Sequence, residues 1–100
     1  MKMVMGIVRT TCLERIVENL AAMEIRDVTI TKVKGIGEQI TLYKAYAIHN
    51  VVLVIVADEK VDQVTNLIIE AARTSSAGDG IVTVCPVDYM IKIRTLKRME

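Results

Sequence analysis

Few side chains in this 100-residue sequence are suited to catalytic or metal chemistry. His49 is its single histidine, and Cys12 and Cys85 stand far apart without the spacing of zinc ligands. No GxSxG, Walker A or HExxH motif occurs, and no nucleophile, base and orienting group can be assembled. The sequence therefore predicts a binding protein and no enzymatic activity, with His49 as a surface or strand-end residue.

Two glycine segments are better candidates for a binding site. KGIG at residues 34–37 follows a β-branched run, and GDG at residues 78–80 precedes another. Because glycine adopts positive φ and lets backbone N–H groups approach a ligand, such segments can form anion-binding concavities. Either segment taken alone is more typical of a tight turn.

Two further patterns leave alternatives open. Lys92 and Arg94 share one face of a predicted strand, which suits either an anion or a solvated edge. Met1, Met3 and Met5 also share a face, and we favour filling of an aliphatic core over binding of a soft metal. The two cysteines are interpreted as free, reduced thiols of a cytoplasmic protein.

Composition narrows the class of protein. Hydrophobic residues make up 52% of the chain, which excludes a disordered chain, and the net charge of +1 argues against a general nucleic-acid binder. No apolar run is long enough for a membrane span, and no signal peptide is expected. With no Phe or Trp, the core must be aliphatic, and a chain this small buries that much aliphatic surface best as a homo-oligomer.

The first half of the chain reads as strand, helix, strand. A strand is predicted over residues 1–8 and a second over 28–34. Thr11 and Glu14 fit a capping box for the helix between them, which should end near Glu24. Its apolar stripe consists of Leu13, Ile16, Val17 and Leu20.

The second half repeats this order. Residues 51–57 predict a central strand buried on both faces, and Asp58 is a plausible N-cap for the next helix. That helix has an apolar face formed by Val61, Val64, Leu67, Ile68, Ala71 and Ala72. A loop at 74–80 leads to a strand at 81–85, broken at Pro86. Residues 89–95 predict a short extra strand, and a frayed tail follows.

Two βαβ halves predict an α+β fold, a ferredoxin-like sandwich with an antiparallel sheet covered by helices on one face. We expect a single domain at residues 1–95 and a C-terminal tail at 96–100. The other sheet face is aliphatic, so it needs a partner, which again favours an oligomer.

Three ordered motifs resemble the P-II signal-transduction family over nearly the whole chain. TITKVKGIG at residues 29–37 is similar to the family's TVTEVKGFG segment. Residues 74–80 resemble its TGxxGDG B-loop, and IKIRT at 91–95 resembles its IRIRT segment. The resemblance implies a trimeric cytoplasmic regulator that binds an adenine nucleotide in a cleft between subunits.

The resemblance also assigns positions to that nucleotide site. Ile7, Thr29 and Val56 would lie near the base, while Lys92 and Arg94 would reach in from the neighbouring subunit. The ribose and phosphates would be surrounded by Gly35, Gly37, Gln39, Gly78, Asp79 and Gly80. Trimerisation would complete the site and bury the aliphatic sheet face.

Several positions depart from the family pattern. Glu38 stands where the family has Arg, Ile81 replaces the Lys after GDG, and Lys92 replaces the first Arg of IRIRT. Asn50 and Val54 replace a Lys and a Glu, and the partner-docking T-loop is shortened. Each lost charged hydrogen bond costs roughly 1.5–3 kcal/mol. We therefore expect AMP or ADP to bind in preference to Mg-ATP.

The resulting hypothesis is a P-II-like regulator, with roles in signal transduction and nitrogen regulation, that controls a partner enzyme or membrane transporter through the shortened loop. A soft-metal-handling trimer of the same fold is the alternative. A third possibility is an enzyme with Glu38 and Asp79 as its acid–base pair.

Overall fold

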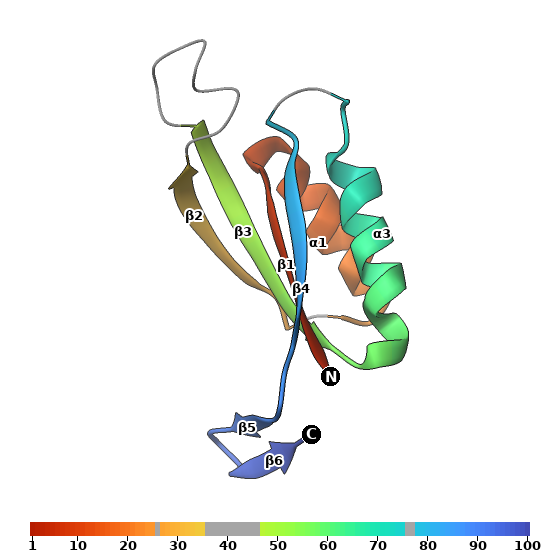
Figure 1. Ribbon diagram of the computed structural model, residues 1–100, viewed down its shortest axis with the longest axis vertical. Coiled ribbons are helices and arrows are strands. Elements are labelled where there is room, and N and C mark those ends of the chain that lie inside the picture. The colour runs from red at the N-terminus through yellow and green to blue at the C-terminus, as the bar shows by residue number, and fades with distance from the viewer. Residues whose placement is uncertain (26, 36–46, 76–77) are drawn as a thin grey trace.

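The computed structural model describes residues 1–25, 27–35, 47–75 and 78–100. Its elements, drawn in Figure 1, follow the predicted order. The first half holds β1 (Lys2–Arg9), the 3-10 helix η1 (Thr10–Cys12), α1 (Leu13–Ala22) and β2 (Thr29–Gly35). The second half holds β3 (Ala47–Val56), the 3-10 helix η2 (Asp58–Lys60), α3 (Val61–Ala72) and β4 (Gly80–Pro86). Two short strands, β5 (Met90–Lys92) and β6 (Lys97–Met99), follow.

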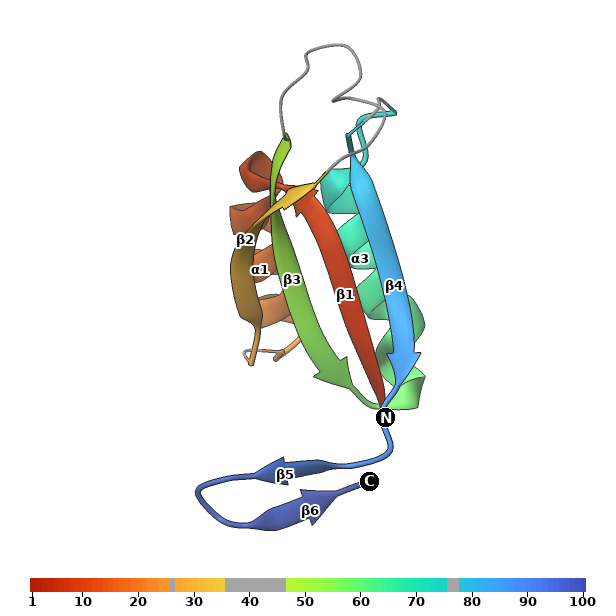
Figure 2. The same cartoon turned by 60° about the vertical axis from the view of Figure 1, so that its left-hand side comes forward.

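The four long strands form one antiparallel sheet in the order β2-β3-β1-β4. Helices α1 and α3 lie side by side on one face of this sheet (Figures 1 and 2). This is the predicted ferredoxin-like α+β arrangement, in which the first strand of each βαβ half occupies the centre of the sheet. No helix in the described part of the chain is both long and apolar enough to span a membrane.

The core lies between the sheet and the two helices. Alternate residues of β1 and β3 face the helices, and Val4 and Val54, which are opposite each other, are at most 1% exposed. They pack with Ile16 and Leu20 of α1 and with Val64 and Ile68 of α3. Burying each such aliphatic side chain contributes about 1.5–3 kcal/mol, which is how an aromatic-poor sequence still forms a stable core.

The other face of the sheet, here called the open face, carries none of the helices that the structure describes. Val51, Leu53 and Ile55 of β3 are only partly buried there, opposite Ile7, Met5 and Met3 of β1. The prediction that β3 is buried on both faces is therefore wrong for the single chain, because its residues alternate between a covered and an uncovered side. The prediction of an aliphatic open face is confirmed.

Both helices start differently from the predicted caps. A 3-10 turn precedes each, so α1 begins at Leu13 and α3 at Val61, and neither N-cap residue makes a side-chain capping bond. Thr11 therefore lies within η1. The neighbouring Thr10 hydroxyl instead donates a 2.6 Å hydrogen bond to the amide oxygen of Asn50, which is 3% exposed.

Asp58 pairs with the N-terminal end of β1 and caps no helix. Its Oδ1 accepts hydrogen bonds from the N-terminal ammonium at 2.7 Å and from Lys2 Nζ at 3.2 Å. These two cations, the ammonium foremost, hold the pKa of the Asp58 carboxyl below its ordinary value of 3.8.

The C-terminal residues form a hairpin that stands apart from the sheet (Figures 1 and 2). β5 and β6 pair antiparallel, with Met90 opposite Met99, and the Leu96 N–H donates to the Lys92 carbonyl at 2.7 Å to close the turn. The Arg98 guanidinium lies 4.1 Å from the centre of the Tyr89 ring. A paired strand thus replaces the expected frayed tail, and the expected strand at 89–95 ends at Lys92.

Candidate functional site

The glycine loop, residues 74–80, connects α3 to β4 and is closed on Asp79. The Asp79 carboxylate accepts hydrogen bonds from the backbone N–H of Thr74 at 2.6 Å, from the N–H of Ser75 at 2.9 Å, and from the Thr74 hydroxyl. Arg9 Nη1 lies 3.4 Å from the same carboxylate and donates to Thr74 Oγ1 at 3.2 Å. These contacts make Asp79 a residue that ties the end of the loop to its start at Thr74 and Ser75.

A second tie joins the glycine loop to the sheet. His49 Nε2, near the start of β3, lies 2.9 Å from the Gly78 carbonyl oxygen. Gly78 has a φ of 93° and Gly80 a φ of 106°, in the region that favours glycine. Neither Arg9 nor Thr74 was among the predicted site residues, because no sequence motif marks a side chain that acts by anchoring a loop.

Gly35 and Gly80 lie at the same end of the sheet, on its two opposite edge strands. β2 ends at Gly35 and β4 begins at Gly80 because the two strands run in opposite directions, and β3 and β1 lie between them (Figure 1). Ile7 lies nearby on the open face, between Val51 and Ile81 in the register. Gly37, Gln39 and Glu38 lie outside the described residues.

A second group of predicted residues lies near the opposite end of the sheet. A cavity of about 610 Å³ is lined by Thr29, Leu53 and Ile55 of the sheet and by Met90 and Lys92 of β5, together with Asp27 and Val28. Thr29 and Lys92 therefore line one cavity of a single chain. The lining combines aliphatic side chains with the Thr29 hydroxyl, the Lys92 ammonium and the Asp27 carboxylate.

Val56, predicted to lie near the base, is 6% exposed and packs in the core, and it lines a neighbouring cavity of about 410 Å³. Ile55, one residue earlier, lines the Thr29 cavity.

Arg94 lies beyond β5, in the turn of the hairpin, and is exposed. Unlike Lys92, it is not among the residues that line the Thr29 cavity. It remains near Lys92 in sequence, at the tip of a hairpin that extends away from the sheet (Figure 2).

The two groups do not meet within one chain. Thr29 and Gly35 are the ends of β2, and a strand of seven residues separates its ends by about 20 Å. One end of the sheet thus presents a cavity that contains Lys92 and Asp27, and the other presents Gly35, Gly78 and Gly80.

Comparison with known proteins decides the family. The family model described as nitrogen regulatory protein P-II matches residues 1–97. The chain belongs to the P-II family. Its sequence is 35% identical to the nitrogen regulatory protein P-II of Rhizobium etli, over 95% of this chain and 93% of that protein. It is 34% identical to the nitrogen regulatory protein GlnK of Escherichia coli, with the same coverage.

The P-II fold is also found in a solved structure. The crystal structure of Arabidopsis thaliana PII bound to citrate superimposes with a TM-score of 0.86 and 32% sequence identity, covering 99% of this chain and 85% of that one. The predicted resemblance is confirmed, and with it the assignment to a family of signal-transduction regulators.

The two cysteines do not come together in this P-II family member. Cys12 lies in η1 and packs against the core, whereas Cys85 lies on β4 opposite Met3. Among the described residues, no group of three His, Cys, Asp or Glu side chains could hold a metal ion. The soft-metal alternative therefore has no observation in its favour.

Proposed function

We propose that this protein is a trimeric P-II regulator that binds an adenine nucleotide between subunits and controls a partner protein. The observation that carries the proposal is the separation of the two half-sites at opposite ends of one sheet. AMP or ADP is too short to contact the Thr29 cavity and the glycine loop of the same chain. Two copies arranged head to tail would bring the cavity of one beside the loop of the next.

A head-to-tail contact has consequences for assembly. Such an interface joins two different surfaces, so it either closes into a ring or continues as a filament. Closure as a trimer would turn the three open faces inward and cover partly buried residues such as Met3, Met5 and Leu53. Burial of this aliphatic surface would supply the main driving force for the ring.

Within the cleft, each half-site has a distinct task. Thr29, Ile55 and Lys92 of one subunit would hold the base and a negative charge, and Ile7 of the next would pack on the base. Backbone N–H groups near Gly35, Gly78 and Gly80 would receive the phosphate. Arg94, on its hairpin, would reach the phosphate across the interface.

Ile81 supports a preference for fewer phosphates. It follows the GDG segment and its side chain is 59% exposed on the open face, so the surface beside the loop is aliphatic. A lysine at this position would donate a charged hydrogen bond worth about 1.5–3 kcal/mol to a polyphosphate. Without this lysine, AMP and ADP lose less binding free energy than Mg-ATP does.

Two relatives support the regulatory part of the proposal. The Escherichia coli relative is a nitrogen regulatory protein, and the Arabidopsis thaliana relative was solved with citrate, a small anion. We extend both properties to this chain as cytoplasmic nitrogen regulation coupled to anion binding. The regulated partner would be an enzyme or a membrane transporter, contacted through the segment at residues 36–48.

The test combines oligomeric state with calorimetry. Light scattering after size-exclusion chromatography should give a trimer, and titration with AMP, ADP and ATP, each with and without Mg²⁺, should give three sites per trimer with AMP or ADP favoured. Citrate serves as the anion without a base. If citrate gave saturable heat and none of the nucleotides did, the proposal of a nucleotide ligand would be wrong. If the protein were a monomer, the proposal of a cleft shared between subunits would be wrong.

A further inference from the structure

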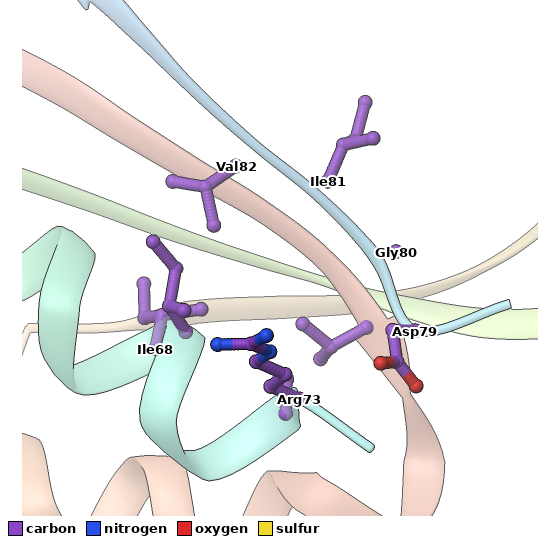
Figure 3. A pocket seen from close by; sticks show the side chains of 9 residues that line it. Ile68, Arg73, Asp79, Gly80, Ile81 and Val82 are labelled. Carbon is purple, nitrogen blue, oxygen red and sulfur yellow. The ribbon is translucent and has the colours of Figure 1, made fainter. Parts of the chain in front are cut away.

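A separate cavity of about 260 Å³ opens on the helix-covered side, between α3 and the edge strand β4. Figure 3 shows it from close by. Most of its lining is aliphatic and comes from three elements: Val8, Ile68, Ile69, Ala72, Ile81 and Val82. Asp79, Gly80 and Ile81 belong both to this cavity and to the surroundings of the glycine loop, whereas the Thr29 cavity shares none of its lining residues.

Arg73 provides the cation of this cavity. Its guanidinium is directed along the aliphatic wall beside Ile68, whereas the Asp79 carboxylate points the other way (Figure 3). Within the part of the chain that the structure describes, no group accepts a hydrogen bond from that guanidinium. The α3 terminus itself is completed by the Arg73 backbone, whose N–H donates to the Ile69 carbonyl at 2.9 Å.

No ion pair joins Asp79 to Arg73. Its oxygens are engaged by the amides of Thr74 and Ser75, and Arg9 is its ion-pair partner at 3.4 Å. Asp79 and Arg73, the two charged residues that line the cavity, therefore do not pair with each other. The cavity combines aliphatic walls with a guanidinium that has capacity for an anion.

We propose that this cavity binds a small aliphatic monocarboxylate. A carboxylate matches the planar fork of a guanidinium and can accept two parallel hydrogen bonds from it. The aliphatic tail of the ligand would then cover Ile68, Ile69 and Val82. A second charged or hydroxyl group would lie against these walls without a partner, which disfavours dicarboxylates and sugar phosphates. The volume is below that of most drug-sized pockets, so the tail must be short.

A carboxylate bound in this cavity would contact both ends of the glycine loop. Arg73 precedes the glycine loop and Gly80 ends it, and both line the cavity. A molecule held between the end of α3 and the start of β4 restrains both ends of the loop. Occupancy would therefore alter how readily the loop takes up a phosphate on the opposite side of the sheet.

The test is an amide NMR titration of the intact protein with hexanoate, with hexanamide as the uncharged analogue and succinate as the charged one. Hexanoate should give saturable shifts at Ile69, Arg73 and Val82, and the two analogues should bind at least tenfold more weakly. Shifts confined to the Thr29 cavity, or equal binding of hexanamide, would overturn the proposal.

Two variants test whether the charge of Arg73 is needed for hexanoate binding. Arg73→Gln should weaken hexanoate binding about tenfold or more, as expected for loss of a charged hydrogen bond. Arg15→Gln removes an exposed arginine from α1 and should leave binding unchanged. Equal affinity of the Arg73→Gln variant would overturn the site. The hexanoate titration is repeated in saturating AMP. Because hexanoate and AMP are proposed to occupy different sites, failure of one ligand to bind does not decide whether the other binds.

Discussion

Gly80 and Ile7 lie backbone against backbone where β4 leaves the glycine loop. A Cβ atom on Gly80 would come within 1.8 Å of the Ile7 carbonyl oxygen, and the φ of Gly80 is +106°. Steric contact and dihedral angle thus require glycine at this position independently of each other. The approach also fixes the loop relative to Ile7, a residue proposed to contact the base.

Gly80→Ala is expected to destabilise the protein by about 3 kcal/mol or more, because the residue must leave its backbone conformation and β4 must shift. Urea denaturation measures this loss. Ile81→Ala is the matched control, since its exposed side chain leaves little to lose. A Gly80→Ala protein as stable as the wild type would show that β4 starts elsewhere.

Asp79→Asn tests the loop anchor. Asparagine keeps one acceptor oxygen but loses the charge that faces Arg9 and the two loop amides. We expect nucleotide binding to fall about tenfold, because the loop donors are no longer held in place. Calorimetry measures the affinity, and Asp62→Asn on the exposed side of α3 should leave it unchanged. Intact affinity in Asp79→Asn would mean that the loop keeps its shape without this carboxylate.

Aliphatic runs made the sheet strands predictable from sequence. Val4 and Val8 of β1 and Val52, Val54 and Val56 of β3 pack under the helices, and a one-residue slip would turn them to the open face. Because β3 is apolar at every position from Val51 to Val56, the sequence alone does not say which of Ile55 and Val56 faces the helices. Assignments carried over from relatives therefore need the register of the strand as a check.

Local contacts were less predictable. Thr11 and Asp58 satisfy the composition of helix caps, yet a 3-10 turn before each helix moves the first helical turn away from them. The hairpin at the C-terminus rests on two strands of three residues, too short to show a period. Arg9 and His49 anchor the glycine loop from distant positions, and only the fold brings them there.

Stability should depend on pH through Asp58. The pKa of its carboxyl is lower in the folded protein than its ordinary 3.8, so the charged form stabilises the fold above pH 3.8 and this contribution is lost as pH falls further. Asp58→Asn should therefore lower the Tm at neutral pH and have little effect near pH 2. Glu59→Gln, its exposed neighbour, is the control. Parallel Tm curves for wild type and Asp58→Asn at every pH would contradict the pairing.

Arg94→Ala tests the contribution of the hairpin. Because Arg94 is exposed in the turn, its loss should weaken AMP binding about tenfold while the trimer persists. Calorimetry and light scattering on the same sample report both quantities. Unchanged affinity would remove Arg94 from the site, and a dissociated trimer would show that the hairpin serves assembly.

Mixed trimers test whether the site is shared. Lys92→Gln impairs the cavity half-site and Asp79→Asn impairs the loop half-site, so each variant alone should bind AMP weakly. When the two chains are unfolded together and refolded at equal amounts, random assortment gives about one quarter of the interfaces two intact halves. Those interfaces should bind AMP with wild-type affinity. Each variant refolded alone is the control, and a mixture without any high-affinity sites would mean that both halves serve a ligand within the same chain.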